Sequence, residues 1–562
     1  MTIKLMNNRS RKFILRAAQT SIARIFFSHF TRITAVVTCV CFLYSAVLSQ
    51  TIHAIVTPAE ETHSSLNAYS GEFSVPYALG RITDAQYMRS DRVVINIQDL
   101  HCHAEVQRNI GKILGLIDRQ YGLSKVYVEG GVGPVDTSWV QALDNRKYRE
   151  KVVETLMDGG VLTGSEYYSI LSGKFNLLQG LEDKTLYTQN LARLGTIINQ
   201  RAEMQSRLPE FAKSITTIQD HYYTSRNQQL NRIIARHDAG ALSAEKYLRL
   251  LLQLAKRADA DLNEYPNTVS FVRLFELQKG LKSKKINKQL VHFLGTLKEK
   301  LPYATYRRLM DNSSGNARAE ELYAALKRAS NEHALDLTSE YKELHRFFTF
   351  ADENQNINPV ALVREEKKLI SDLHDRFSAS AAEREVAYIA DFFEYVERYV
   401  NNKLSAEDHR YYVSHQAKFR QLWAKYTTTN TLPALEPYYA VLDKFYAVNI
   451  ERNNSFLKNI FSNDLPAPAA GGVLRVPRVD QLATVTESLK SAKEIIVVVT
   501  GGFHTDGLTH LLKDRGISYL VITPSITKDA KIAEATYSEL AKQQAAVFGA
   551  QAFALMLEST FL

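Results

Sequence analysis

The same local pattern occurs near both ends of the chain: a run of β-branched residues, a short turn, and a histidine ahead of an amphipathic segment. The first copy is VVINIQDLH, which ends at His101, and the second is EIIVVVTGGFH, which ends at His504. Apolar runs of this length, bounded by turn residues, are typical of buried strands. Because open α/β sheets bind ligands at the carboxyl ends of their strands, the pattern predicts that both histidines share one strand edge.

The residues after each histidine indicate strand-helix-strand units. After His101, apolar residues recur at helical spacing up to a glycine, and KVYVEGG then has the composition of another strand. After His504, Thr505 is the expected cap of a short helix, and ISYLVIT is the following strand. We therefore predict an α/β fold with a mostly parallel sheet and flanking helices. Helix N-termini beside both histidines would favour negative charge.

Two further turns place carboxylates at the same expected edge. Glu129 follows the strand in KVYVEGG, and Glu182 follows a short strand in FNLLQGLED. Imidazoles and carboxylates gathered at strand ends form either an oxygen and nitrogen metal site or a general acid and base pair. We predict that His101, His504 and Glu129 lie within roughly 10 Å of one another and hold a divalent metal ion.

Other residues near these turns are candidates for cofactor binding or for catalysis. Gly501 and Gly502, at the expected start of a helix, are candidate cofactor-binding residues. Glu182 is a candidate catalytic base. Within the sequence HCH, His101 and His103 are too close to share one helical face, so only one is expected to point into the site, and His101 matches the position of His504.

The motifs resemble those of a superfamily that contains Tiki metalloproteases, TraB pheromone-shutdown proteins, ChaN-like haem-binding proteins and erythromycin esterases. The resemblance rests on GGFH, on the strand-ending Glu129 and on ERNNSFLKNI, and covers roughly residues 90–185 and 445–525. It implies that His101, Glu129, Arg452 and His504 surround one cleft. The first motif departs from the family pattern, because Gln98 stands where the family has glycine.

The resemblance also implies catalytic roles. Glu129 and Arg452 would be catalytic residues, with Arg452 polarising the scissile carbonyl or stabilising an oxyanion. We predict a metal-dependent hydrolase of the peptidase or esterase type, acting on a peptide or a small-molecule ester. A metal-free esterase with a histidine as general base is a close variant. A non-catalytic protein of the ChaN-like type, binding haem or another ligand in the same cleft, is the alternative.

The N-terminus predicts export. Residues 1–32 contain seven Lys or Arg and no acidic residue, and residues 33–52 carry no charge. Such a stretch, close to the ~20 residues of a spanning helix, is typical of an export signal or an uncleaved membrane anchor. Because the basic flank stays in the cytoplasm, the folded part is expected to be periplasmic or anchored to the inner membrane facing outward.

The charge and the cysteine content argue against nucleic-acid binding and against an intramolecular disulfide. The chain carries +9 in total, and the N-terminal segment supplies seven of these charges, which leaves about +2 for the rest. No basic stripe suggests nucleic acid as a partner. Cys102 is the one cysteine beyond the N-terminal segment, so no intramolecular disulfide is expected.

A long central stretch has helical periodicity with polar opposite faces. It shows no 34- or 40-residue repeat, which disfavours a solenoid. We predict a large all-helical insertion that serves as a lid, a specificity wall or a homodimer surface. The predicted organisation is an export signal or anchor (1–57), two halves of an α/β core (70–185 and 446–562) and the helical insertion (186–445).

Overall fold

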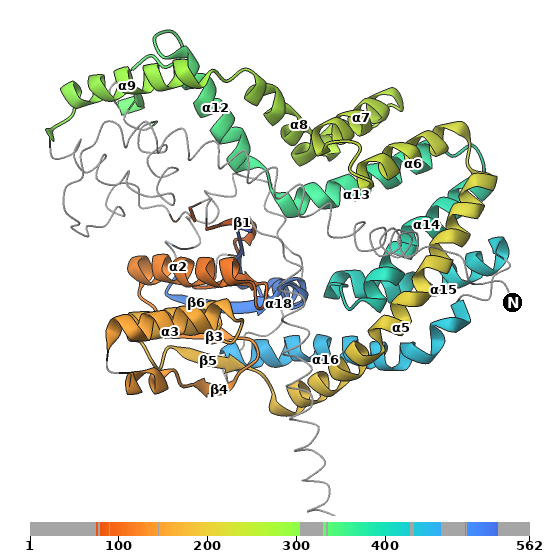
Figure 1. Cartoon of the computed structure of the whole chain (residues 1–562), viewed down its shortest axis with the longest axis horizontal. Coiled ribbons are helices and arrows are strands. Elements are labelled where there is room, and N and C mark those ends of the chain that lie inside the picture. Colours follow the sequence, from red (N-terminus) through yellow and green to blue (C-terminus); the bar gives the residue numbers. More distant parts are fainter. Residues whose placement is uncertain are drawn as a thin grey trace, which may run out of the picture. The chain divides into compact units, whose positions relative to one another are not determined.

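A computed structural model describes residues 79–303, 335–461 and 492–526, with gaps at 89, 144 and 428–431, and a few isolated positions outside these ranges (Figure 1). The predicted export signal or anchor lies outside the described residues. Among the described helices, none is long and apolar enough to cross a membrane. The described residues form two compact units, one containing residues 213–388 and the other combining residues from the range 64–212 with residues from 389 onward.

The second of these, the sheet unit, contains a seven-stranded mixed sheet with the strand order β1-β7-β2-β6-β3-β5-β4. The strands are β1 (Gly80–Gln86), β2 (Arg92–Asp99), β3 (Val126–Val128), β4 (Val132–Val135), β5 (Leu178–Leu181), β6 (Glu494–Gly501) and β7 (Ser518–Pro524). The five central strands are parallel, and the edge strands β1 and β4 are antiparallel to their neighbours. The prediction of an α/β fold with a mostly parallel sheet is therefore confirmed.

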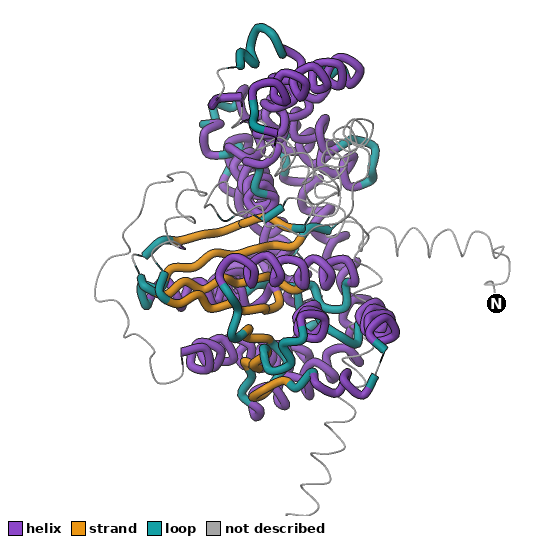
Figure 2. The backbone as a smooth tube through the Cα atoms, turned by 90° about the vertical axis from the view of Figure 1, so that its left-hand side faces the viewer, coloured by secondary structure: helices purple, strands orange, loops and turns teal. Residues whose placement is uncertain are grey.

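Within the sheet unit, helices cover both faces of the sheet (Figure 2). The helices of this unit are α2 (Ala104–Tyr121), η2 (Ser138–Ala142), α3 (Arg146–Asp158), α4 (Gly164–Ser172), α15 (Ala406–Tyr426), η5 (Leu432–Ala434), α16 (Glu436–Phe461) and α18 (Gly502–Asp514), with the first part of α5 (Lys184–Tyr222) and the last part of α14 (Ala381–Val400).

Alternate residues of the central strands face two different cores, as the two-residue repeat of a strand requires. Val93, Ile95 and Ile97 of β2 pack in a cluster with residues of α2. Val94 faces the other way and packs in a cluster with residues of α16 and α18. Helices cover both faces, so the central strands are apolar on both sides, as buried parallel strands are.

A similar turn joins three pairs of consecutive helices: α3 to α4, α6 (Ser225–Asp238) to α7 (Ala244–Arg257), and α14 to α15. Each turn has a residue with positive φ, then a buried leucine two positions later, and then a hydroxyl residue that caps the next helix. These residues are Gly160, Leu162 and Thr163; Gly240, Leu242 and Ser243; and Asn402, Leu404 and Ser405. Positive φ favours Gly or Asn, and the hydroxyl satisfies a backbone N–H, so this short motif specifies a helical hairpin.

The other unit is helical throughout its described part. It contains α6, α7, η3 (Leu262–Glu264), α8 (Pro266–Lys279), α9 (Ser283–Lys300), α12 (Lys342–Asn356) and α13 (Pro359–Phe377). Buried carboxylates hold the starts of several helices. Glu383 accepts hydrogen bonds from the N–H groups of Thr224 and Ala379, each at 2.8 Å, and Glu365 accepts one from Thr268 at 2.8 Å. These contacts satisfy N–H groups that a helix start would leave unpaired.

Two local predictions need correction or refinement. Thr505 does not cap α18, because the helix starts at Gly502 with Gly501 as its N-cap, and His504 lies in the first helical turn. The helical stretch predicted at 186–445 is divided between the two units, since residues 186–212 and 389–445 belong to the sheet unit. Of these, α15 packs against α18.

Candidate functional site

The candidate residues follow neighbouring strands at one edge of the sheet. β2 pairs in parallel with β6, so that Asp99 lies opposite Gly501, and β6 pairs in parallel with β3. His101 and His504 therefore come after adjacent strands, and Glu129 follows the next one. The prediction that both histidines share one strand edge is confirmed. Glu182 extends the row, because it follows β5, which is paired with β3.

The side chains of His101, Glu129 and His504 lie close together around Gly501. The Nε2 atom of His101 lies 3.2 Å, and the Oε2 atom of Glu129 lies 3.3 Å, from the position that a β carbon would take on Gly501. The Nε2 atom of His504 lies 3.3 Å from the Oε1 atom of Glu129. The three side chains thus lie well within the predicted 10 Å. Any side chain at position 501 would crowd both His101 and Glu129.

His101 forms a dyad with Asp99. The Nδ1 atom of His101 is 2.6 Å from the Oδ2 atom of Asp99. The Asp99 side chain is 5% exposed, whereas that of His101 is 32% exposed and so remains accessible to solvent. Burial alone would lower the pKa of His101, but the Asp99 carboxylate raises it to about 9. His101 is therefore a cation at neutral pH.

Gln107, on α2, fixes the other oxygen of Asp99. Its Nε2 donates to Asp99 Oδ1 at 2.5 Å and to the Leu100 carbonyl at 3.3 Å, and its Oε1 accepts from the Gly164 N–H at 2.6 Å. The sequence reasoning missed both Asp99 and Gln107. The position of Asp99, two residues before the histidine at a strand end, is a signal that could have revealed it.

The other residues of HCH have structural contacts. His103 is the N-cap of α2, and its Nδ1 accepts the Val106 N–H at 3.4 Å. Cys102 has φ of 62°, and burial raises the pKa of its thiol to about 11. The thiol therefore stays protonated at neutral pH. Of the two histidines in this segment, His101 belongs to the shared cluster, as predicted.

Arg452 of α16 lies at the centre of a buried ion-pair network. Its Nε and Nη2 atoms donate to the two oxygens of Glu182 at 3.0 and 2.5 Å, and Nη2 also donates to Glu129 Oε1 at 3.0 Å. Its Nη1 donates to Asn449 at 2.6 Å. The Arg452 and Glu182 side chains are 4% and 0% exposed. These contacts oppose a role for Glu182 as a base, because both of its carboxylate oxygens already accept hydrogen bonds, from Arg452 and from the Gly130 N–H.

Glu129 is ionised and held on both sides. Its Oε2 accepts the Gly501 N–H at 2.7 Å, while its Oε1 contacts Arg452 and His504. Burial opposes ionisation, but His504 and Arg452 hold the pKa of Glu129 well below its usual range. Burial lowers the pKa of His504 and outweighs the attraction of Glu129. Since the two groups titrate together, the pair at neutral pH is an ionised carboxylate beside a neutral imidazole.

The predicted metal ligands meet some requirements of a metal site. Each imidazole has its Nδ1 held by another side chain, by Asp99 at 2.6 Å and by Asn453 at 2.7 Å, as metal-binding histidines commonly do. Glu129 fits less well, because both of its oxygens already accept hydrogen bonds and Arg452 is adjacent. Among the described residues, no group of three or more His, Cys, Asp or Glu side chains is arranged to hold a metal ion. Of the three predicted metal ligands, Glu129 is therefore the one whose contacts fit the role least.

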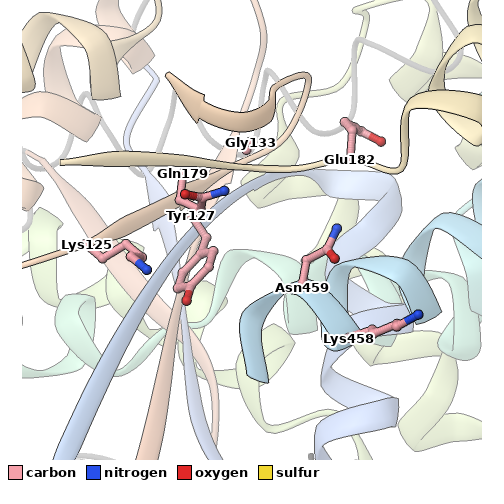
Figure 3. Close-up of a pocket in the computed structure, with 8 residues that line it drawn as sticks. Lys125, Tyr127, Gly133, Gln179, Glu182, Lys458 and Asn459 are labelled. Carbon is pink, nitrogen blue, oxygen red and sulfur yellow. The ribbon is translucent and has the colours of Figure 1, made fainter. Parts of the chain in front are cut away.

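A pocket of about 430 Å³ lies at the far end of this row (Figure 3). Glu182 forms part of its wall, and none of the other predicted site residues does. Its lining residues are Lys125, Tyr127, Gly133, Gln179, Gly180, Glu182, Lys458 and Asn459. The pocket is therefore separate from the cluster around Gly501.

The Asp99 and His101 dyad predicts a pH-dependent contribution to stability. The pKa of His101 is about 9 in the folded chain and 6.5 for an unperturbed histidine. Because the folded value is higher, the dyad stabilises the fold fully below pH 6.5, and this contribution is lost as the pH rises through about 9. NMR titration of the ring should give a midpoint near 9 in the native chain and a lower one in Asp99→Asn. A native midpoint at or below 6.5 would contradict this assignment.

Gly501 and Gly502 lie at the start of α18, where the sequence placed candidate cofactor contacts. The N–H of Gly501 is taken by Glu129, and a β carbon on Gly502 would have no heavy atom within 4 Å. The open space beside Gly502 leaves room for a bound group.

In comparisons with protein-family models, curated proteins and solved structures, this chain matches none.

Proposed function

We propose that this protein is a hydrolase that cleaves a peptide or small-molecule ester by proton transfer at the strand edge. The observation that carries the proposal is the dyad of a buried Asp99 and a solvent-accessible His101, next to the ionised Glu129. Two titratable groups whose surroundings move their pKa values apart are typical of an acid and a base that act together. The resemblance to erythromycin esterases and Tiki proteases supports the same reaction class.

The charge states suggest distinct roles. Protonated His101 donates a proton to the leaving group, because its pKa keeps it charged at neutral pH. Neutral His504 accepts the proton of the attacking water at Nε2, and the ionised Glu129 beside it stabilises the imidazolium that forms. Arg452 and Glu182 hold Glu129 in place rather than contact the substrate. The N-terminus of α18 at Gly502 favours the negative charge that develops on the carbonyl oxygen.

A metal ion at His101, His504 and Glu129 stays a second proposal, favoured by the way each Nδ1 is held. A bound metal would act as a Lewis acid or activate water. The metal-free and metal-dependent mechanisms are distinguished by assaying the purified protein with chromogenic esters and peptides, before and after chelation. The metal content and the haem absorbance of the same protein are measured alongside.

The proton-transfer version expects hydrolysis that survives chelation. The metal version expects that chelation abolishes activity and that His504→Ala lowers metal content and activity together. Haem absorbance without turnover would instead support the ligand-binding alternative. Absence of hydrolysis on both substrate classes, with and without added divalent metal, would overturn the hydrolase proposal.

We also propose that the helical unit of residues 213–388 selects substrates and that the N-terminal segment exports or anchors the protein. Residues flanking that unit are close to each other in the sheet unit, because the rings of Phe211 and Phe393 stack at 5.9 Å. Replacing 213–388 with a short linker should therefore leave a folded sheet unit with an altered substrate range. Unchanged selectivity in a folded deletion variant would favour an interaction or homodimer role. Cell fractionation of the full chain tests the proposed location.

A further inference from the structure

Gln107 links the His101 dyad to the start of α4. The helices α2 and α4 pack closely, because glycines lie where they meet. A β carbon on Gly111 of α2 would lie 3.1 Å from a ring atom of Tyr167. A β carbon on Gly164 of α4 would lie 2.2 Å from the backbone carbonyl oxygen of Gln107, so a larger residue at position 164 would force the helices apart. This close approach brings the N–H of Gly164 to the Gln107 side chain.

The contacts of the Gln107 carboxamide allow one orientation. Its oxygen accepts the N–H of Gly164 at 2.6 Å. Its nitrogen donates to Asp99 Oδ1 at 2.5 Å and to the Leu100 carbonyl at 3.3 Å. Turning the amide over would set its nitrogen against a backbone N–H and its oxygen against two acceptors. Because Gln107 is 1% exposed, water cannot relieve such a mismatch, so the backbone of α4 fixes Gln107 as a donor toward Asp99.

A donor at Asp99 Oδ1 determines where the proton of the dyad lies. It stabilises the ionised carboxylate, which accepts hydrogen bonds only, and the second oxygen, Oδ2, is 2.6 Å from His101 Nδ1. The proton of that bond therefore belongs to Nδ1. The other ring nitrogen, Nε2, lies 3.2 Å from the position of a β carbon on Gly501, among the residues of the candidate site. Nε2 is thus the nitrogen that can exchange a proton with a substrate.

We propose that Gln107 is a positioning residue, which keeps Asp99 ionised and turned toward His101 through a hydrogen-bond relay that starts at the N–H of Gly164. Gln107 acts through Asp99 and does not contact the substrate. Its effect on catalysis rests on the proposed function, whereas the relay itself can be measured without a substrate. A failure of the hydrolase proposal and a failure of the relay are therefore distinguishable.

The first measurement is the exchange with solvent of the Nδ1 proton of His101, which NMR detects and which is identified by its absence in His101→Ala. Gln107→Met keeps the side-chain size but removes the donor. In this variant the proton should exchange about tenfold faster than in the native chain, because Asp99 loses the hydrogen bond that prevents it from rotating away. The kcat of hydrolysis should fall about 10–100-fold with KM unchanged, since substrate contacts stay intact.

Asn109→Leu is the matched control. It removes another buried carboxamide of α2, which donates to the Ser525 carbonyl at 2.9 Å and takes no part in the relay. Both the proton exchange and kcat should stay at their native values. Equal acceleration of the exchange in Asn109→Leu and Gln107→Met would mean that general packing of α2, not the relay, holds the dyad, and would overturn the proposal.

Gln107→Glu tests the direction of the relay. Burial and the adjacent Asp99 should raise the pKa of the new carboxyl group well above its usual range. While protonated, this group can donate its O–H to Asp99 as the amide does, and its other oxygen can accept the N–H of Gly164. Compared with the native chain at the same pH, the exchange of the His101 proton should therefore be unchanged at acidic pH and faster once the new group ionises.

Three results decide the proposal. Native exchange in a folded Gln107→Met overturns it. Exchange in Gln107→Glu that differs from the native chain by the same factor at every pH also overturns it, and this variant decides alone if circular dichroism shows that Gln107→Met does not fold. The expected exchange pattern in a chain that hydrolyses neither esters nor peptides would refute the proposed function and support the relay.

Discussion

Arg452→Met should destabilise the sheet unit by about 3–5 kcal/mol, the usual cost of leaving a buried charge without its partner. The substitution keeps much of the side-chain volume but removes the guanidinium that forms ion pairs with Glu182 and Glu129. Both tryptophans of the chain, Trp139 and Trp423, belong to the sheet unit, so tryptophan fluorescence during urea unfolding reports on this unit alone.

Two further variants make the measurement specific. Arg452→Met combined with Glu182→Gln should be more stable than Arg452→Met alone, because the second change removes one of the two stranded carboxylates. Arg146→Met removes an ion pair with Glu150 in which the arginine is 85% exposed, and it should change stability little. If Arg452→Met is no more destabilising than Arg146→Met, the buried network does not hold Glu129 in the way proposed.

His101→Ala and Asp99→Asn should each reduce hydrolysis by about 10²–10⁴-fold, the range that a positioned acid or base contributes. The first removes the imidazole at the strand edge, and the second removes the charge that raises its pKa to about 9. In Asp99→Asn, the remaining activity should decline at a lower pH than in the native chain, because the imidazole loses its proton earlier. The measurement is kcat as a function of pH on the best substrate found.

His103→Asn is the control for this segment. Asparagine is a good N-cap residue, so it preserves the start of α2 without disturbing the dyad. Activity should stay within about twofold of the native value. Full activity in His101→Ala would place catalysis elsewhere, and loss of activity in His103→Asn equal to that in His101→Ala would mean that local structure, not the dyad, controls the rate.

The local sequence was sufficient to predict the strands that precede the candidate site residues. The β-branched runs ending near His101 and His504 form β2 and β6, and the carboxylates at Glu129 and Glu182 do follow short strands. Strand composition and turn residues act over a few positions, so they are visible in the sequence. The start of α18 was misplaced because Thr505 and Gly501 are both acceptable caps, and local preference alone does not choose between them.

The strand-end positions in the sequence were enough to predict that parallel strands bring two histidines and two carboxylates to one edge of the sheet. Which groups each of these side chains contacts depends on how distant segments pack together. β6 lies between β2 and β3, which sets His101 and Glu129 on either side of Gly501. Arg452 meets Glu182 across 270 sequence positions. Contacts of this kind depend on the packing of distant segments and on the burial of charges. Neither produces a local pattern that can be recognised in the sequence.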